Sequence, residues 1–152
     1  MVRLFILPLA IVILDQVTKA LVEKTVPIGA SLPVLRGLAE ITRIYNPGSA
    51  LGVLSTARIP IIVSCLVIIA WLIAVTRGSY KLVDAKARLG IEMVVGGAAG
   101  NLIDRIRLGH VIDFIDVSIW PVFNVADIAV CVGAAVLLYS LVTGNPGGRS
   151  SK

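Results

Sequence analysis

Long apolar runs constrain this sequence more than any other feature. Four windows approach the roughly 20 residues that an α-helix needs to cross the hydrocarbon core of a bilayer. They cover residues 4–22, 59–76, 89–103 and 124–142. In a chain of 152 residues that is 57% hydrophobic and 15% charged, these runs leave little sequence for a water-soluble domain. The sequence therefore predicts an α-helical membrane protein with four transmembrane helices, of which the third is short and completed by tilt or by flanking residues.

The rest of the sequence divides into an outer loop, a second connection and a short tail. Residues 23–58 contain several turn-forming Pro and Gly residues and a β-branched run from Glu40 to Tyr45, and a second strand-like run covers residues 111–117. We therefore expect a single polytopic membrane domain over residues 1–143, with a small extracytoplasmic β-cradle. Residues 144–152 are rich in Gly and Ser, which predicts a flexible C-terminal tail.

Positive charge determines the expected orientation. The loop between the second and third predicted spans carries Arg77, Lys81, Lys86 and Arg88, and short loops rich in Lys and Arg usually face the cytoplasm. This orientation places both termini in the cytoplasm and residues 23–58 outside. The net charge of +5 comes without a basic block, so we expect membrane lipid and not nucleic acid as a partner.

Five aspartates fall near the predicted outer face. Asp15 lies in the outer half of the first span, Asp104 ends the third, and Asp127 begins the fourth, while Asp113 and Asp116 lie on the connection between the last two spans. Ionisable groups in or near hydrocarbon are costly and usually functional. Two neighbouring carboxyls can hydrolyse a peptide bond, because one stays protonated while the other acts as a base on a shared water.

Two pairs of these polar residues also have a structural interpretation. Asn124 can cap the fourth span, with Asp127 at the third helical position, where a carboxylate favours the helix dipole. Asp104 can form an interfacial ion pair with its neighbour Arg105. These roles remain open beside a role in chemistry.

Other polar residues and several glycines also have structural interpretations. Asp15 can pair with Lys19 four residues later on the same helix. Asp116 fits a solvated loop charge, and the lone His110 fits a polar surface group without metal-ligand spacing. A small-residue face that lets two helices approach closely is expected from Gly96, Gly97 and Gly100.

Three motifs in the same order resemble those of the lipoprotein signal peptidase, or signal peptidase II, family. They are GGAAGNLIDR at residues 96–105, GHVIDF at 109–114 and FNVAD at 123–127. The likeness extends to DQVTK at residues 15–19 and NPGSA at 46–50, and it covers nearly the whole chain. One departure is Leu51, which stands where the family often has an aromatic residue and bears on how closely the outer loop covers the substrate.

The resemblance implies a bacterial intramembrane aspartyl endopeptidase of the cytoplasmic (inner) membrane, with its active site near the outer face. Such an enzyme removes the signal peptide from diacylglyceryl-modified prolipoproteins by cleaving just before the lipidated cysteine. At the matching positions, Asp113 and Asp127 would be the catalytic pair. The supporting or substrate-binding residues would be Asp15, Asn46, Gly48, Asn101, Asp104, Arg105, Asn124 and Ala126. The resemblance also implies four transmembrane helices with a β-cradle, and we expect a monomer that uses no metal or organic cofactor.

Two other classes of protein fit part of the pattern. A small proton-coupled exporter would hold its key carboxylate at mid-membrane, whereas the carboxylates here gather at one face. A lipid-headgroup phosphotransferase would use Asp104, Asp113 and Asp116 as magnesium ligands. A chelator separates the two enzymes, because it would abolish phosphotransfer and leave an aspartyl protease active.

Overall fold

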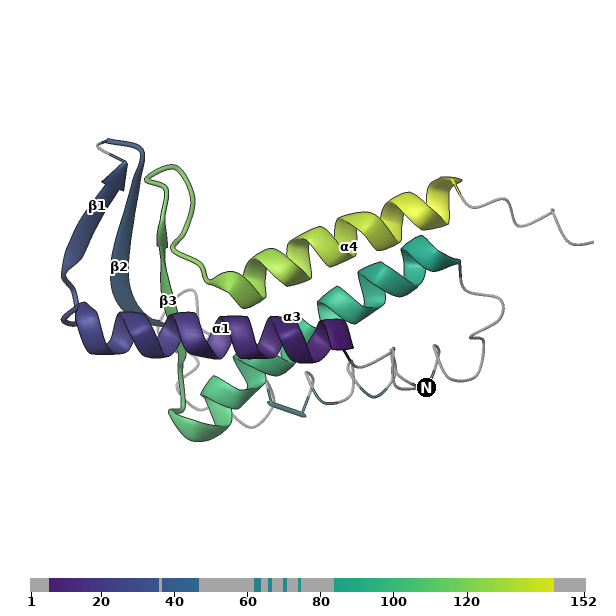
Figure 1. Ribbon diagram of the computed structural model, residues 1–152, viewed down its shortest axis with the longest axis horizontal. Coiled ribbons are helices and arrows are strands. Elements are labelled where there is room, and N and C mark those ends of the chain that lie inside the picture. Colours follow the sequence, from purple (N-terminus) through teal and green to yellow (C-terminus); the bar gives the residue numbers. More distant parts are fainter. Residues whose placement is uncertain are drawn as a thin grey trace, which may run out of the picture.

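The computed structural model describes residues 6–35, 37–46 and 84–143, together with helical positions 62, 63, 66, 70 and 74. The predicted tail at 144–152, Gly48, Leu51 and most of the predicted span at 59–76 lie outside these described residues. The described elements are, in order, α1 (Ile6–Thr25), β1 (Ser31–Leu35), β2 (Ala39–Asn46), α3 (Ala85–Arg107), β3 (Val111–Asp116) and α4 (Val125–Thr143). Figure 1 shows the sheet at one end of the helices, where α1 ends.

The first, third and fourth apolar windows of the sequence correspond to α1, α3 and α4. Among the described residues, only α4 is long and apolar enough by itself to cross a membrane, with a mean hydropathy of 2.3. α1 and α3 carry more charge, and part of this charge is buried within the protein, as at Asp15, Lys19 and Asp104. The two helices therefore present polar groups to each other.

α3 extends beyond the predicted window of residues 89–103 at both ends. Asp84 caps its start, because the side-chain Oδ1 accepts a hydrogen bond from Ala87 N at 2.6 Å. At the other end Gly109, with φ of 85°, follows the C-cap Leu108 and donates its N–H to Arg105 O at 3.2 Å. A hydropathy window does not include the first and last helical turns of α3, because these turns contain charged residues.

α3 packs between α1 and α4 through glycines that allow close backbone contact. A Cβ at Gly96 would lie 3.0 Å from Ile11 Cβ of α1, and a Cβ at Gly97 would collide with Ala126 O of α4. Gly90 and Gly133 form a second close contact between α3 and α4, since a Cβ at Gly90 would lie 2.6 Å from Gly133 O. The expected small-residue face is present, and it serves both neighbouring helices.

The sheet is antiparallel, with strand order β1-β2-β3. The strand-like runs predicted at residues 40–45 and 111–117 are confirmed, because they form β2 and β3. Pro33 lies in β1, an edge strand, where the missing N–H is tolerated. In the register of β2 and β3, Asn46 lies opposite Val111 and Ile44 lies opposite Asp113. This pairing brings the end of β2 to the residues that follow α3.

Two sets of contacts hold the sheet on the end of α1. Val22 and Val26, at the end of this helix, form a buried cluster with Phe114 of β3. Arg43 of β2 donates from Nη1 to Glu23 O at 2.9 Å and pairs through Nη2 with Glu23 Oε1 at 3.1 Å. These bonds satisfy groups at a helix end and fix where β2 lies.

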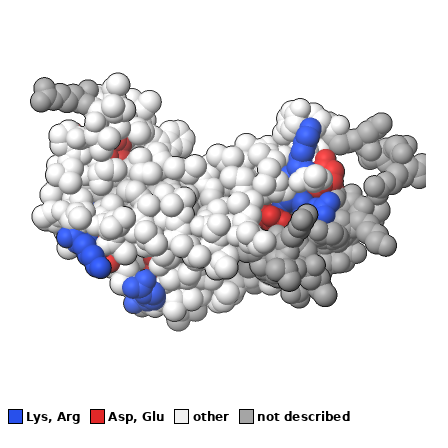
Figure 2. Space-filling view, in the orientation of Figure 1, with Lys and Arg blue, Asp and Glu red and all other residues white. Residues whose placement is uncertain are grey.

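Charged side chains gather toward the two ends of the molecule on the face in Figure 2, and most of the middle carries neither sign of charge. Exposed apolar side chains are numerous on α4 and include Ile128, Val132 and Leu138. A broad uncharged surface between two charged ends suits a helical protein whose sides contact lipid.

Candidate active site

The start of α4 is built around Asn124 and Asp127. Asn124 Oδ1 accepts a hydrogen bond from Asp127 N at 3.0 Å, and Asp127 Oδ2 accepts one from Asn124 N at 3.1 Å. This reciprocal pair is a capping box, in which Asp replaces the more usual Glu. The capping interpretation of Asp127 is therefore confirmed, and Asp127 Oδ1 faces a different partner, Asn101.

Asp113, on β3, is held by two side-chain amides. Asn124 Nδ2 donates to Asp113 Oδ1 at 2.7 Å, and Asn46 Nδ2 donates to Asp113 Oδ2 at 2.9 Å. The carboxyl is buried, with Asp113 only 4% exposed. Burial raises the pKa of Asp113 and the charge of Asp127 raises it further, while the amide of Asn46 acts in the opposite direction.

Asn101 of α3 links the two aspartates. Its Nδ2 donates to Asp127 Oδ1 at 2.8 Å, and its Oδ1 accepts from Asn124 Nδ2 at 3.1 Å. Because Asn124 also donates to Asp113, a chain of amides from α3 and α4 connects both carboxyls. The aspartates thus belong to one network, although Asp113 comes from β3 and Asp127 from α4.

Lys19 and Asp104 form a buried polar layer beneath this network. Lys19 Nζ lies 2.8 Å from Asp15 Oδ2 and 2.7 Å from Asp104 Oδ2. The expected pair between Asp15 and Lys19 is confirmed, and Lys19 supplies Asp104 with a buried partner from another helix. Asp104 Oδ2 also accepts from Ile112 N at 3.3 Å, which ties α3 to the start of β3.

Asp15 connects α1 to both of the other helices. Its Oδ1 accepts a hydrogen bond from Ala126 N at 3.0 Å, one of the N–H groups that a helix start leaves without an intrahelical partner. A Cβ at Gly100 would lie 2.6 Å from Asp15 Oδ2, so α3 needs glycine at this position. The structure therefore brings together five residues that the sequence motifs selected, namely Asp15, Asn101, Asp104, Asn124 and Ala126.

The other predicted residues lie at the margin of this network or outside it. Arg105 Nη1 donates to Asn101 O at 3.3 Å on its own helix. Asp116 Oδ1 accepts from Ser118 N at 2.8 Å in an exposed turn, and the His110 ring lies 4.0 Å from the ring of Tyr45. These contacts agree with the structural interpretations of Asp116 and His110.

Sequence reasoning did not select Lys19 or Gln16 as site residues. Gln16 Nε2 donates to Asp104 Oδ1 at 2.9 Å and Gln16 Oε1 accepts from Arg107 Nη1 at 3.2 Å. The signal was present, because both residues lie in the DQVTK motif with Asp15. Their partners on α3 follow only from the way the helices pack.

The arrangement suits hydrolysis by two carboxyls. Within residues 6–35, 37–46 and 84–143 no group of three or more His, Cys, Asp or Glu residues is placed to hold a metal ion. Asp104, Asp113 and Asp116 therefore do not form the magnesium site of a phosphotransferase. A pair of carboxyls in which one is ionised and the other protonated can activate water, and burial raises the pKa of Asp113 in the direction that favours its protonated form.

Solved structures place the fold among membrane enzymes. Two structures, each described as a bacterial membrane enzyme, match this chain with TM-scores of 0.86 and 0.85 at 28% and 30% sequence identity. The matches cover 100% and 95% of this chain and 94% and 96% of the solved chains. The protein is thus a membrane protein of the enzyme class that these structures represent.

Sequence comparisons identify the family. The family model described as Signal peptidase (SPase) II matches residues 7–143. A lipoprotein signal peptidase of Halothermothrix orenii is 40% identical over 140 residues, which cover 90% of this chain and 93% of the relative. One of Geobacter sulfurreducens is 41% identical over 136 residues, which cover 86% and 85% of the two chains. The chain belongs to the signal peptidase II family.

Proposed function

We propose that Asp113 and Asp127 are the catalytic pair with which this family member, an aspartic endopeptidase, removes signal peptides from prolipoproteins. The substrate carries a diacylglyceryl group, and cleavage falls just before the lipidated cysteine. The observation that carries the assignment is the shared amide network, which links the two carboxyls through Asn101 and Asn124. Asp15 and Asp104 also share an amide, that of Gln16, but Lys19 Nζ lies 2.8 Å and 2.7 Å from their carboxylates and pairs with both.

In the proposed reaction one carboxyl is ionised and the other protonated. The ionised carboxylate takes a proton from water as the water oxygen bonds to the scissile carbonyl carbon, and the protonated carboxyl donates to the carbonyl oxygen. The tetrahedral intermediate then collapses, the C–N bond breaks, and the leaving nitrogen accepts a proton from the pair. The raised pKa of Asp113 suits it to the protonated role, because burial disfavours its charged form.

We assign supporting roles to the residues that hold this pair in place. Asn46, Asn101 and Asn124 donate to the two carboxyls. Asp15 fixes the start of α4 through Ala126 N, and Asp104 ties α3 to β3. The proposed set of supporting or substrate-binding residues is completed by Arg105 and by Gly48, which lies outside the described residues.

For the whole chain we propose four transmembrane helices in one domain over residues 1–143, with the sheet on the outer face of the cytoplasmic (inner) membrane. The proposed pair lies at the end of the helices that carries the sheet, while Lys86 and Arg88 lie at the other end of α3. Arg105 and Arg107 lie at the sheet end of α3, so the orientation rests on the short loop before α3, which carries Arg77, Lys81, Lys86 and Arg88 and favours a cytoplasmic location. Both termini then lie in the cytoplasm, and the chain acts as a monomer in contact with membrane lipid.

The test is cleavage of a diacylglyceryl-modified prolipoprotein peptide by purified protein in detergent with excess chelator. The native chain should cut before the lipidated cysteine, and Asp113→Asn and Asp127→Asn should each lose activity while keeping their helical circular dichroism. Asp116→Asn is the matched control, since it changes an aspartate on the same strand whose side chain accepts from Ser118 N in an exposed turn. Normal cleavage by either dyad variant would refute the assignment, and loss of activity with chelator would favour a metal enzyme.

A further inference from the structure

Lys19 is a buried cation with three polar partners. Its exposed fraction is 2%, and an ammonium group carries three N–H donors and no acceptor. The structure supplies three acceptors, which are Asp15 Oδ2 at 2.8 Å, Asp104 Oδ2 at 2.7 Å and Asn101 Oδ1 at 3.0 Å. The two carboxylates balance its charge, so the bond to the neutral amide of Asn101 calls for a separate explanation.

That third bond determines which way the Asn101 amide faces. An ammonium cannot accept a hydrogen bond, so Lys19 requires the amide oxygen, and the Nδ2 group then faces Asp127 Oδ1 at 2.8 Å. The same oxygen also accepts from Asn124 Nδ2, whose other bond is to Asp113 Oδ1. A reversed Asn101 amide would place N–H groups against both Lys19 and Asn124 and an oxygen against Asp127.

We propose that Lys19 is a positioning residue for the catalytic pair: by holding the amide oxygen of Asn101, its ammonium orients the amides that bind Asp127 and Asp113. This inference rests on the proposed function of the two aspartates. Lys19 comes from α1, whereas the pair comes from β3 and α4, so the role couples the first helix to the chemistry.

The charge of Lys19 acts on the same groups. Its nearest charged neighbours are Asp15 on its own helix and Asp104 on α3, and beyond Asn101 lie Asp113 on β3 and Asp127 on α4. The positive charge lowers the pKa of Asp113, against the larger effect of burial. Removing it leaves more negative charge around the pair, so the apparent pKa values of the pair should rise.

The experiment compares Lys19→Met with Lys24→Met, the same change at an exposed position of the same helix. Cleavage of the lipidated peptide is measured from acid to alkaline pH and normalised to the folded fraction, which is determined by size exclusion and thermal unfolding. In Lys19→Met, kcat should fall on the order of 100-fold with little change in KM, as expected when reacting groups are misplaced. Both limbs of the pH profile should move to higher pH, whereas Lys24→Met should match the native chain.

Lys19→Arg keeps the test decisive if loss of a buried cation leaves too little folded Lys19→Met. Arginine restores the charge but presents its donors in a planar fork, so the pH limbs should return toward native while kcat recovers only in part. Lys19 variants whose normalised kcat and pH profile equal those of Lys24→Met would overturn the inference. A native chain that does not cleave the peptide would instead refute the proposed function.

Discussion

The two proposed catalytic aspartates differ in how the fold holds them. Asp127 belongs to the capping box of α4, so its carboxylate also stabilises the helix start. Asp113 has no such local role, and its carboxyl depends on the amides of Asn46 and Asn124. Ionisation of Asp113 therefore lowers the stability of the folded state. Such a loss of stability is common at functional sites.

This difference predicts how Asp113→Asn changes stability with pH. A carboxyl whose folded-state pKa is raised contributes stability below its unfolded-state pKa and loses that contribution as pH rises through the folded value. Asparagine cannot ionise, so the stability of Asp113→Asn relative to the native chain should increase with pH across that window. Thermal unfolding in detergent from about pH 4 to pH 8 measures the difference.

A second variant checks the cause of this pH dependence. Asn46→Ala removes a hydrogen bond that favours the ionised form of Asp113, so the loss of stability with rising pH should be steeper than in the native chain. A constant difference between Asp113→Asn and the native chain at all pH values would show that the Asp113 carboxyl is not destabilised by ionisation.

The sequence could predict which residues belong to the site better than what each one contacts. The motifs selected Asp15, Asn101 and Asp104, and local spacing suggested the pair of Asp15 with Lys19. They did not show that Lys19 reaches Asp104 and Asn101, because these residues are 85 and 82 positions away in the chain. Contacts of this kind depend on how closely α1 and α3 approach, which no single segment determines.

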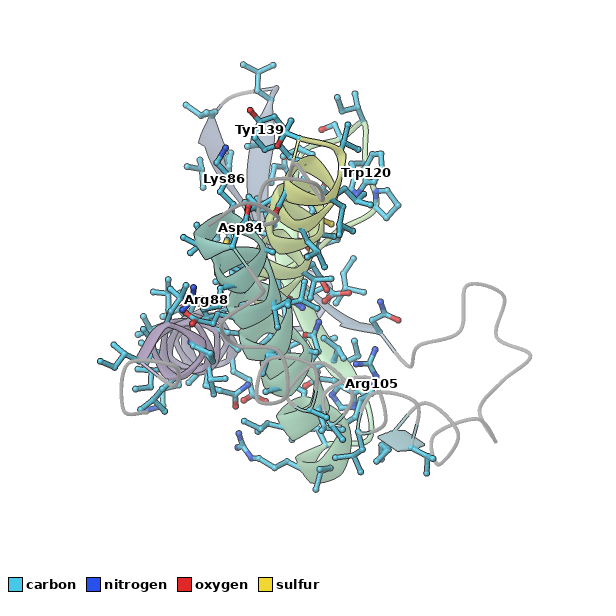
Figure 3. The ribbon with its side chains drawn as sticks, turned by 90° about the vertical axis from the view of Figure 1, so that its right-hand side faces the viewer. Asp84, Lys86, Arg88, Arg105, Trp120 and Tyr139 are labelled. Atoms are coloured by element: carbon cyan, nitrogen blue, oxygen red, sulfur yellow. The ribbon has the colours of Figure 1, made fainter. Side chains whose placement is uncertain are left out.

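Among the elements, α3 positions the site by contacting both other described helices. Its glycines permit backbone contact at two levels, one near the start of α4 at Gly97 and one near the opposite end at Gly90. At that opposite end, Asp84 accepts from Ser140 Oγ at 2.8 Å, and Lys86 lies over the ring of Tyr139 at 4.8 Å. Figure 3 shows Asp84, Lys86 and Tyr139 at this end of the two helices. These contacts hold α3 and α4 together at the end away from the proposed catalytic pair.

The two levels should respond differently to an added methyl group. Gly97→Ala would press on Ala126 O, next to Asp127, so both stability and kcat should fall. Gly90→Ala would press on Gly133 O far from the pair, so it should lower stability by about 1–3 kcal/mol with a much smaller effect on kcat per folded molecule. Denaturant unfolding and peptide cleavage on the same samples compare the two, and equal losses of kcat would contradict local control of the site by Gly97.

The elements themselves were predicted to different degrees. α1, α4 and β3 end within a few residues of the predicted ranges, because apolar runs and alternation change abruptly there. β1 was not singled out, since all five of its residues are exposed and it contains Pro33. Its position follows from pairing with β2, which is a property of the sheet and not of its own sequence.

At the scale of the whole molecule, the described helices have two chemically different ends. The end with the sheet carries the proposed catalytic pair together with Lys24, Arg105 and Arg107, and the other end carries Lys86 and Arg88 at the start of α3. In the orientation we propose, the substrate would reach the site from the outer side of the membrane only. The proposed orientation therefore predicts which end of the helices a membrane-impermeant reagent can reach from outside the cell.

Single-cysteine labelling measures that consequence. Cys65 and Cys131 are first replaced by alanine, and then Lys24→Cys or Lys86→Cys is introduced, both at exposed lysines at opposite ends of the helices. In intact cells a membrane-impermeant maleimide should label the Lys24→Cys protein and leave the Lys86→Cys protein unlabelled until the membrane is opened, because only the end with the sheet faces outward. The reverse pattern would place the two aspartates on the cytoplasmic side. It would contradict the proposed orientation, in which Lys86 and Arg88 face the cytoplasm because basic loops usually face inward. Labelling of both proteins in intact cells would mean that these two ends do not lie on opposite sides of the membrane.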